Sequence, residues 1–280
     1  MLTAAIIGAG DLGGAVAHAL ASRDRLSRIA LVDAGGSVAA GKALDIQQMG
    51  AVDGFHTRLD GSADMARIIG CDVCIVADQF GRTSSEWSAD EGAAMLSRLR
   101  ENLADAPVVL AGASQADLLA AAVRDARLPR TRVLGSAPEA FRSAVTGIVA
   151  LEARCSPREV RLTVLGAPGR FVIPWSEASI GGYSIEHVLT QVQLTRIEAR
   201  AARLWPPGVY TLGLAAARVA EAILTSSRES LHVLTLLDGQ FNVKGQAGAL
   251  PVLLAPHDIA RVRTPALSTK ERVQVESSLG

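Results

Sequence analysis

The chain has 280 residues, with 28 basic and 28 acidic side chains. This balance excludes the positive field that recruits nucleic acid or an anionic membrane, and it favours a small-molecule partner. The length allows a sizeable core, no apolar run reaches the roughly 18 residues of a membrane span, and no secretory leader is recognisable, so we expect a cytoplasmic protein.

The first predicted element is a strand that leads through a tight turn into a helix. The apolar run 4–7 breaks into Gly8-Ala9-Gly10-Asp11-Leu12-Gly13, which matches the G-x-G-x-x-G fingerprint of dinucleotide-binding folds. A second apolar strand, 29–32, ends on Asp33, whose carboxylate can accept both hydroxyls of an adenosine ribose. We therefore predict a dinucleotide site formed by Gly8, Gly10, Asp11, Leu12, Gly13 and Asp33.

Strands alternate with helices through the rest of the first half, which predicts a parallel, doubly wound sheet. A second helix is expected to start at Gly41, and Thr57–Ser62 to form a polar connection to a further helix. The later segments are a strand over 72–77, a polar loop over 78–91, a helix over 92–103, a strand over 108–111, a helix over 117–127 and a strand over 132–135. Cys71 and Cys74 form a C-x-x-C at the start of an apolar strand, where neither a redox pair nor a metal site is expected.

The second half has a different order of elements. A helix is predicted over 139–154, and the apolar segments 160–165 and 171–175 are close enough in sequence to form an antiparallel hairpin. Two long helices, 185–204 and 209–226, precede three strands in meander order near 233–237, 250–254 and 259–262. The capping box that starts at Ser268 predicts a C-terminal helix.

The order of these motifs resembles the NAD-dependent lactate/malate dehydrogenases. The resemblance is carried by Gly8-Ala9-Gly10, Asp33, Gly41-Lys42-Ala43-Leu44-Asp45-Ile46, Ser156-Pro157-Arg158-Glu159-Val160 and Leu237-Asp238-Gly239. It covers the whole chain and implies an α/β fold, with a Rossmann-type NAD-binding domain over 1–137 and an α+β substrate domain over 138–280. It also implies NAD as cofactor, with Ala77 and Asp78 near its path, and a homo-oligomer, either a dimer or a tetramer.

The family's catalytic groups are nearly all replaced when they are carried over one position at a time. Pro168 stands at the proton-exchanging histidine, Ala137 at the aspartate that orients this histidine, and Ala140 at the carboxylate-binding arginine. Trp87 stands at the arginine that polarises the substrate carbonyl, and Gly112 at the asparagine. Because a base, its partner and a carboxylate clamp are missing together, we expect the reaction to be lost while the fold is kept.

Two arginines remain as candidates to contact a small carboxylic or hydroxy acid. They are Arg142, the family's second arginine, and Arg82, which lies near the substrate-selecting position. No histidine is expected to replace the missing base. Each one is predicted to be solvated or to cap an element: His18, His56, His187, His232 and His257.

Asp78 leaves two interpretations open, because the family usually has glycine at this position. Its carboxylate either repels a cofactor phosphate, or points to solvent and caps the loop. Three functions follow: an NAD(H)-binding protein without malate or lactate dehydrogenase activity, an oxidoreductase with a rebuilt site, or an interaction subunit without cofactor. The polar groups available to a rebuilt site are Asp78, Glu86, Glu139, Arg142, Arg170 and Tyr210.

Overall fold

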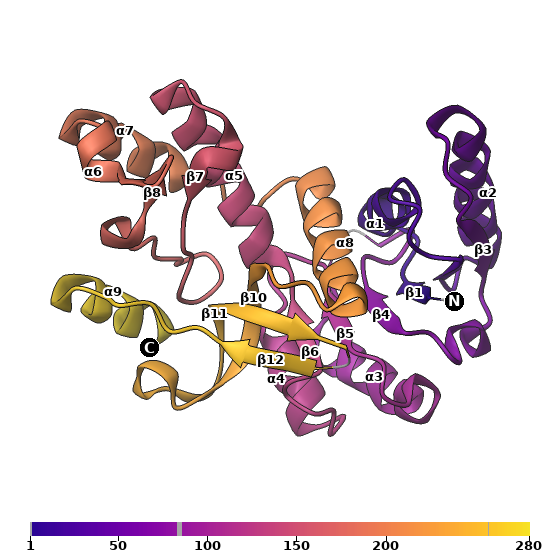
Figure 1. Ribbon diagram of the computed structural model, residues 1–280. Helices are drawn as coiled ribbons and strands as arrows, with labels where there is room; N and C mark the ends of the chain where they lie inside the picture. The colour runs from indigo at the N-terminus through magenta and orange to yellow at the C-terminus, as the bar shows by residue number, and fades with distance from the viewer. Residues whose placement is uncertain (1, 83–85, 257) are drawn as a thin grey trace.

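The computed structural model describes residues 2–82, 86–256 and 258–280. His257 and the centre of the predicted loop over 78–91 therefore lie outside the described residues. Within the described residues, nine strands form one sheet in the order β12-β11-β10-β6-β5-β4-β1-β2-β3 (Figure 1). No described helix is long and apolar enough to cross a membrane.

The parallel part of this sheet is the predicted doubly wound arrangement. Its strands are β1 (Thr3–Ile7), β2 (Arg28–Val32), β3 (Arg58–Ser62), β4 (Val73–Val76), β5 (Val108–Leu110) and β6 (Val133–Gly135). The strand order reverses at β1, which pairs with β2 on one side and β4 on the other. Ligands of open α/β sheets bind at such a reversal, outside the carboxyl ends of the strands.

Helices cover both faces of the sheet. They are needed on both because successive apolar residues of each parallel strand point to opposite faces. In β1, Ala4 and Ile6 pack in a core with α1 (Asp11–Ala21), α2 (Gly36–Asp53) and α8 (Val209–Thr225). Ala5 and Ile7 face the opposite core. The elements on that face are the 3-10 helix η1 (Met65–Ile68), α3 (Ala89–Leu103) and α4 (Ala116–Arg124).

The second half adds three antiparallel strands to the edge of the parallel sheet. The predicted meander is formed by β10 (Ser230–Asp238), β11 (Lys244–Ala255) and β12 (Asp258–Val262), and β10 pairs with β6 through Leu234 and Gly135. The remaining elements are α5 (Ala137–Ala153), η2 (Pro157–Glu159), β7 (Val160–Arg161), η3 (Trp175–Glu177), β8 (Ser179–Ile180), β9 (Tyr183–Ser184), α6 (Ile185–Val188), α7 (Gln191–Ala201), η4 (Gln240–Asn242) and α9 (Thr269–Leu279). The predicted capping box is confirmed: the Ser268 side chain accepts from the Glu271 amide, and the Glu271 carboxylate accepts from the Ser268 amide.

Two predictions in the first half were wrong at the α2–β3 unit. Residues 57–62 are not a connection but contain β3, whose polar residues are tolerated because β3 is the edge strand and pairs with β2 alone. Helix α2 begins at Gly36 rather than Gly41. The close packing of α2 on β3 requires Gly61, since a Cβ there would lie 2.1 Å from the Ala39 carbonyl oxygen.

Two predictions in the second half also need correction. The helix predicted over 185–204 is broken into α6 and α7, because Thr190 and Gln193 form a capping box that starts a new helix. The hairpin keeps one bridge, between Leu165 and Val172. Strand β7 pairs with β8 instead of the 171–175 segment.

Candidate functional site

The glycine-rich turn between β1 and α1 has the geometry that its sequence predicts. Gly8 has a φ of +106°, which favours glycine. A Cβ at Gly13 would lie 2.0 Å from the Gly8 carbonyl oxygen, so the helix packs closely on the strand. Asp11 is exposed, and its carboxylate lies 3.7 Å from Nζ of Lys42.

The Asp78 side chain lies inside this turn. Its carboxylate accepts hydrogen bonds from the backbone N–H groups of Leu12 (3.1 Å) and Gly13 (2.8 Å) at the start of α1. The side chain is buried, so the interpretation that it points to solvent was wrong: it caps α1 rather than the loop. The cause is the unpaired N–H groups in the first turn of a helix, which attract a carboxylate.

Asp33 is also buried and engaged with the backbone. Its carboxylate accepts from the amides of Ala9 (2.8 Å), Gly35 (2.8 Å) and Phe80 (3.0 Å). The cavity that Asp33 lines with Trp87 measures about 150 Å³. This is below the roughly 300–1,000 Å³ that small-molecule sites usually offer.

The positions predicted to replace catalytic groups are apolar or filled from within the chain. Ala137 and Ala140, at the start of α5, are buried in the core that also contains the 165–167 segment before Pro168. After β5, the Glu86 carboxylate accepts from the Ala113 amide at 2.6 Å and lies where a Cβ on Gly112 would be.

Trp87 turns back onto the sheet instead of presenting a cationic group. Its indole Nε1 donates to the carbonyl oxygen of Ala77 at 2.7 Å. Arg82 lines a separate cavity of about 580 Å³ with Trp87, and its guanidinium pairs with Glu91 at 2.7 Å.

A buried charged cluster that the sequence did not predict lies between α5, α8 and the start of β10. Both oxygens of the Glu139 carboxylate are within 3.0 Å of the Arg142 guanidinium, and the His232 backbone N–H donates to Oε2 at 3.1 Å. Arg218 of α8 adds a guanidinium 3.5 Å from Oε1. Burial alone would raise the pKa of Glu139, but its contacts with His232 and Arg142 outweigh this and lower the pKa to about 2.

His232 was predicted to be solvated or capping, and this was wrong. It follows the start of β10 and is 5% exposed, and its Nδ1 lies 3.5 Å from Glu139. Burial lowers the pKa of His232 although Glu139 is close, and Arg142 and Arg218 lower it further, so the ring is neutral at pH 7. Neither ring nitrogen has a hydrogen-bond partner among the described residues.

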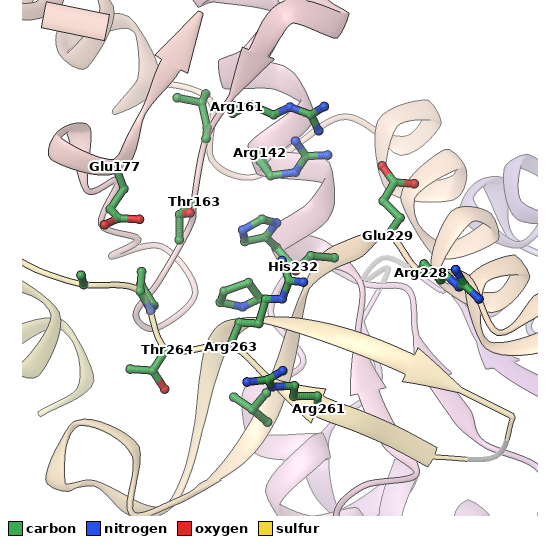
Figure 2. Close-up of a pocket in the computed structure, with 16 residues that line it drawn as sticks. Arg142, Arg161, Thr163, Glu177, Arg228, Glu229, His232, Arg261, Arg263 and Thr264 are labelled. Carbon is green, nitrogen blue, oxygen red and sulfur yellow. The ribbon is translucent and has the colours of Figure 1, made fainter. Parts of the chain in front are cut away.

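His232 and Arg142 line a cavity of about 840 Å³, here called the basic pocket. In Figure 2 the imidazole lies between Arg142 and Arg263. Four further arginines are among the lining residues and have no ion pair with any described residue: Arg161, Arg228, Arg261 and Arg263. Two carboxylates line the pocket. Glu229 pairs with Arg218, whereas Glu177 has no ion pair with any described residue.

The sequence carries one signal for the charged cluster beside this pocket. Glu139 sits among buried apolar residues of α5, where a charge requires a partner. The structure does not bring the two predicted substrate arginines together, because Arg82 and Arg142 line different cavities.

No protein-family model matches this chain. The malate dehydrogenase of Thioalkalivibrio sulfidiphilus is 30% identical to it, over 98% of this chain and 95% of that protein. The chain belongs to the malate/lactate dehydrogenase family. The malate dehydrogenase of Myxococcus xanthus is 28% identical over 98% of the chain.

Solved structures of the family share the fold. Malate dehydrogenase from Salinibacter ruber superimposes with a TM-score of 0.89 at 23% identity, covering 99% of this chain and 94% of that one. The minor L-lactate dehydrogenase from Enterococcus mundtii gives 0.87 at 20% identity, covering 99% and 95%.

The cofactor that the family resemblance implies does not fit the residues as they are arranged in this chain. The second glycine of the fingerprint has no side chain, so that a pyrophosphate can approach its backbone. Here a Cβ on Gly10 would lie 2.3 Å from Cγ of Asp78, so the approach is already filled.

Proposed function

We propose that this chain is a non-catalytic member of the malate/lactate dehydrogenase family that no longer dehydrogenates malate or lactate. The observation that carries the proposal is the set of side chains at the family's proton-transfer and carboxylate-binding positions. Pro168, Ala137 and Ala140 cannot ionise, so they can neither exchange a proton with a 2-hydroxy acid nor hold its carboxylate.

The alternative of a rebuilt oxidoreductase site has less support, because the three carboxylates available to it are engaged at separate places. Asp78 is bonded to α1, Glu86 to the turn after β5, and Glu139 to Arg142. Tyr210 is 83% exposed on α8. None of Asp78, Glu86 and Glu139 lines any of the three cavities described above.

The basic pocket supports a second candidate function, binding of a small molecule with two or more phosphate or carboxylate groups. Four unpaired guanidinium groups against one unpaired carboxylate give a local excess of positive charge in a neutral chain. Guanidinium groups match phosphate and carboxylate oxygens in pairs, so such a ligand would be held by two or more arginines at once.

Calorimetric titration with inorganic pyrophosphate and with citrate tests this second function. We expect binding that weakens as salt rises, and a loss of about tenfold for each of Arg261→Ala and Arg263→Ala. Arg67→Ala, which removes an exposed arginine on η1, is the matched control and should bind as the wild type does. Equal affinity in all four proteins, or no heat with the wild type, would refute the assignment.

Loss of dehydrogenation is tested by following NADH absorbance with oxaloacetate and with pyruvate. The proposal predicts no enzyme-dependent oxidation of NADH with either substrate.

A further inference from the structure

The carboxylate of Asp78 lies where the glycine-rich turn of this fold receives a pyrophosphate. We propose that Asp78 is a built-in ligand of the turn, and that it excludes nicotinamide dinucleotides from the wild-type protein. This inference rests on the proposed function, since it adds the loss of the nucleotide site to the proposed loss of the catalytic residues.

The first support is the chemistry of the hydrogen bonds. The amides of Leu12 and Gly13 are among those that begin α1 without a partner in the helix, and they are aimed at one Asp78 oxygen each. An anion at a helix N-terminus is held by such N–H groups and by the positive end of the helix dipole. Both are already used by the carboxylate.

The second support is occupancy. A Cβ built on Gly10 would lie within 2.6 Å of Cγ and both carboxylate oxygens of Asp78. The chain therefore fills the face of Gly10 that a fingerprint glycine leaves open. Asp78 also lies two residues after the end of β4, and its carbonyl oxygen accepts from the Gly10 amide at 3.0 Å, so its backbone is fixed against the turn.

The third support comes from the position expected for the adenosine ribose, next to the pyrophosphate. Asp33, the residue predicted to hold the ribose hydroxyls, accepts three backbone hydrogen bonds, one of them from Phe80, two residues beyond Asp78. The same short segment after β4 thus occupies both the phosphate position and the ribose acceptor.

The test is NADH binding to the wild-type protein and to Asp78→Ala and Asp78→Gly, measured by tryptophan quenching and by thermal shift. Trp87 lies at the site and reports locally. We expect wild-type binding weaker than about 1 mM, and binding at least about 100-fold tighter in both variants. NADH should raise the melting temperature of the variants and leave that of the wild type unchanged.

Asp72→Ala is the matched control. Asp72 precedes the amino end of β4, and its carboxylate bonds to the Thr3 amide at 2.7 Å, far along the strand from the glycine turn. This variant should not gain NADH binding. Micromolar binding by the wild type, or a folded Asp78→Ala without any gain, would overturn the inference. Either result leaves the loss of dehydrogenation standing, since that proposal fails only if NADH is consumed with a substrate.

Discussion

At the scale of single residues, the Glu139 carboxylate connects three elements of the fold. It lies on α5 and contacts Arg218 of α8 and the backbone of His232 in β10. A buried carboxylate is stable as an anion only when such partners surround it. The cluster therefore fixes α5, α8 and β10, which all lie in the second half of the chain, against one another.

Glu139→Gln should destabilise the protein by about 3–5 kcal/mol, because it leaves Arg142 buried without its counter-charge. We expect a fall in melting temperature of roughly 5–10 °C by calorimetry. Glu91→Gln removes the partner of Arg82 in an exposed pair and should leave the melting temperature almost unchanged. Equal shifts in the two variants would contradict the role given to Glu139.

The same cluster predicts how stability depends on pH. The folded-state pKa of Glu139 is about 2, below its ordinary value of 4.5, so its contribution is complete above pH 4.5 and is lost as the pH falls towards 2. The pKa of His232 is also lowered, so stability falls as the pH drops below 6.5 and the buried ring must be protonated. The melting temperature of the wild type should fall steadily from pH 7 to pH 3. In Glu139→Gln the fall that Glu139 causes below pH 4.5 should be absent.

At the scale of elements, α2 and α8 expose apolar side chains that the fold itself does not cover. Leu44 is 58% exposed and Val52 93% exposed on α2, and Leu214 is 50% exposed on α8. Other apolar residues of these helices are buried in the chain's own core: Ile46, Leu212 and Val219. The exposed apolar side chains of α2 and α8 are therefore available to a partner, and we propose that they form a dimer interface.

Light scattering at micromolar concentration should give a dimer for the wild type and a monomer for the double variant Leu44→Glu and Leu214→Glu. A charge introduced at the centre of an apolar interface is desolvated without a partner. Leu151→Glu, at a 72% exposed position on α5, serves as the control and should remain dimeric. A monomeric wild type would refute this arrangement.

Local elements were predictable where the sequence carries a local signal. The glycine turn, the apolar strands β1 and β2 and the capping box at Ser268 depend on residues within a few positions of one another. The break at Thr190 and the strand β3 were missed because their signals are weak: a threonine cap inside a helical pattern, and a polar edge strand that is fixed by pairing with β2.

At the scale of the whole molecule, the family, the α/β fold and the doubly wound sheet could be predicted, because the order of motifs extends along the entire chain. The contacts that decide the site could not. The Asp78 carboxylate meets an amide 65 residues earlier, and Glu139 meets one 93 residues later. No periodicity or spacing predicts such pairs, and the attachment of β10 to β6 is likewise fixed by packing between distant segments. The division at residue 137 stays a prediction.

We propose that this chain has kept the fold of the family and given up its reaction. Two like charges 4 Å apart repel by about 4 kcal/mol at an effective dielectric constant of 20, so the role proposed for Asp78 predicts a cofactor affinity lower by up to about 10³-fold. Loss of the base that the family resemblance places at position 168 would remove a further factor of about 10²–10⁴ in rate. A histidine restored at position 168 would also lack an aspartate behind it, because Ala137 cannot stabilise its cation.

The most direct measurement is NADH oxidation with oxaloacetate and with pyruvate, for the wild-type protein and for Pro168→His. Groups that act as a unit are not additive, so we expect no turnover from either protein. Wild-type turnover of about 1 per second or more, which is in the ordinary range of enzymes, would contradict the account and show that the proton is supplied by another residue.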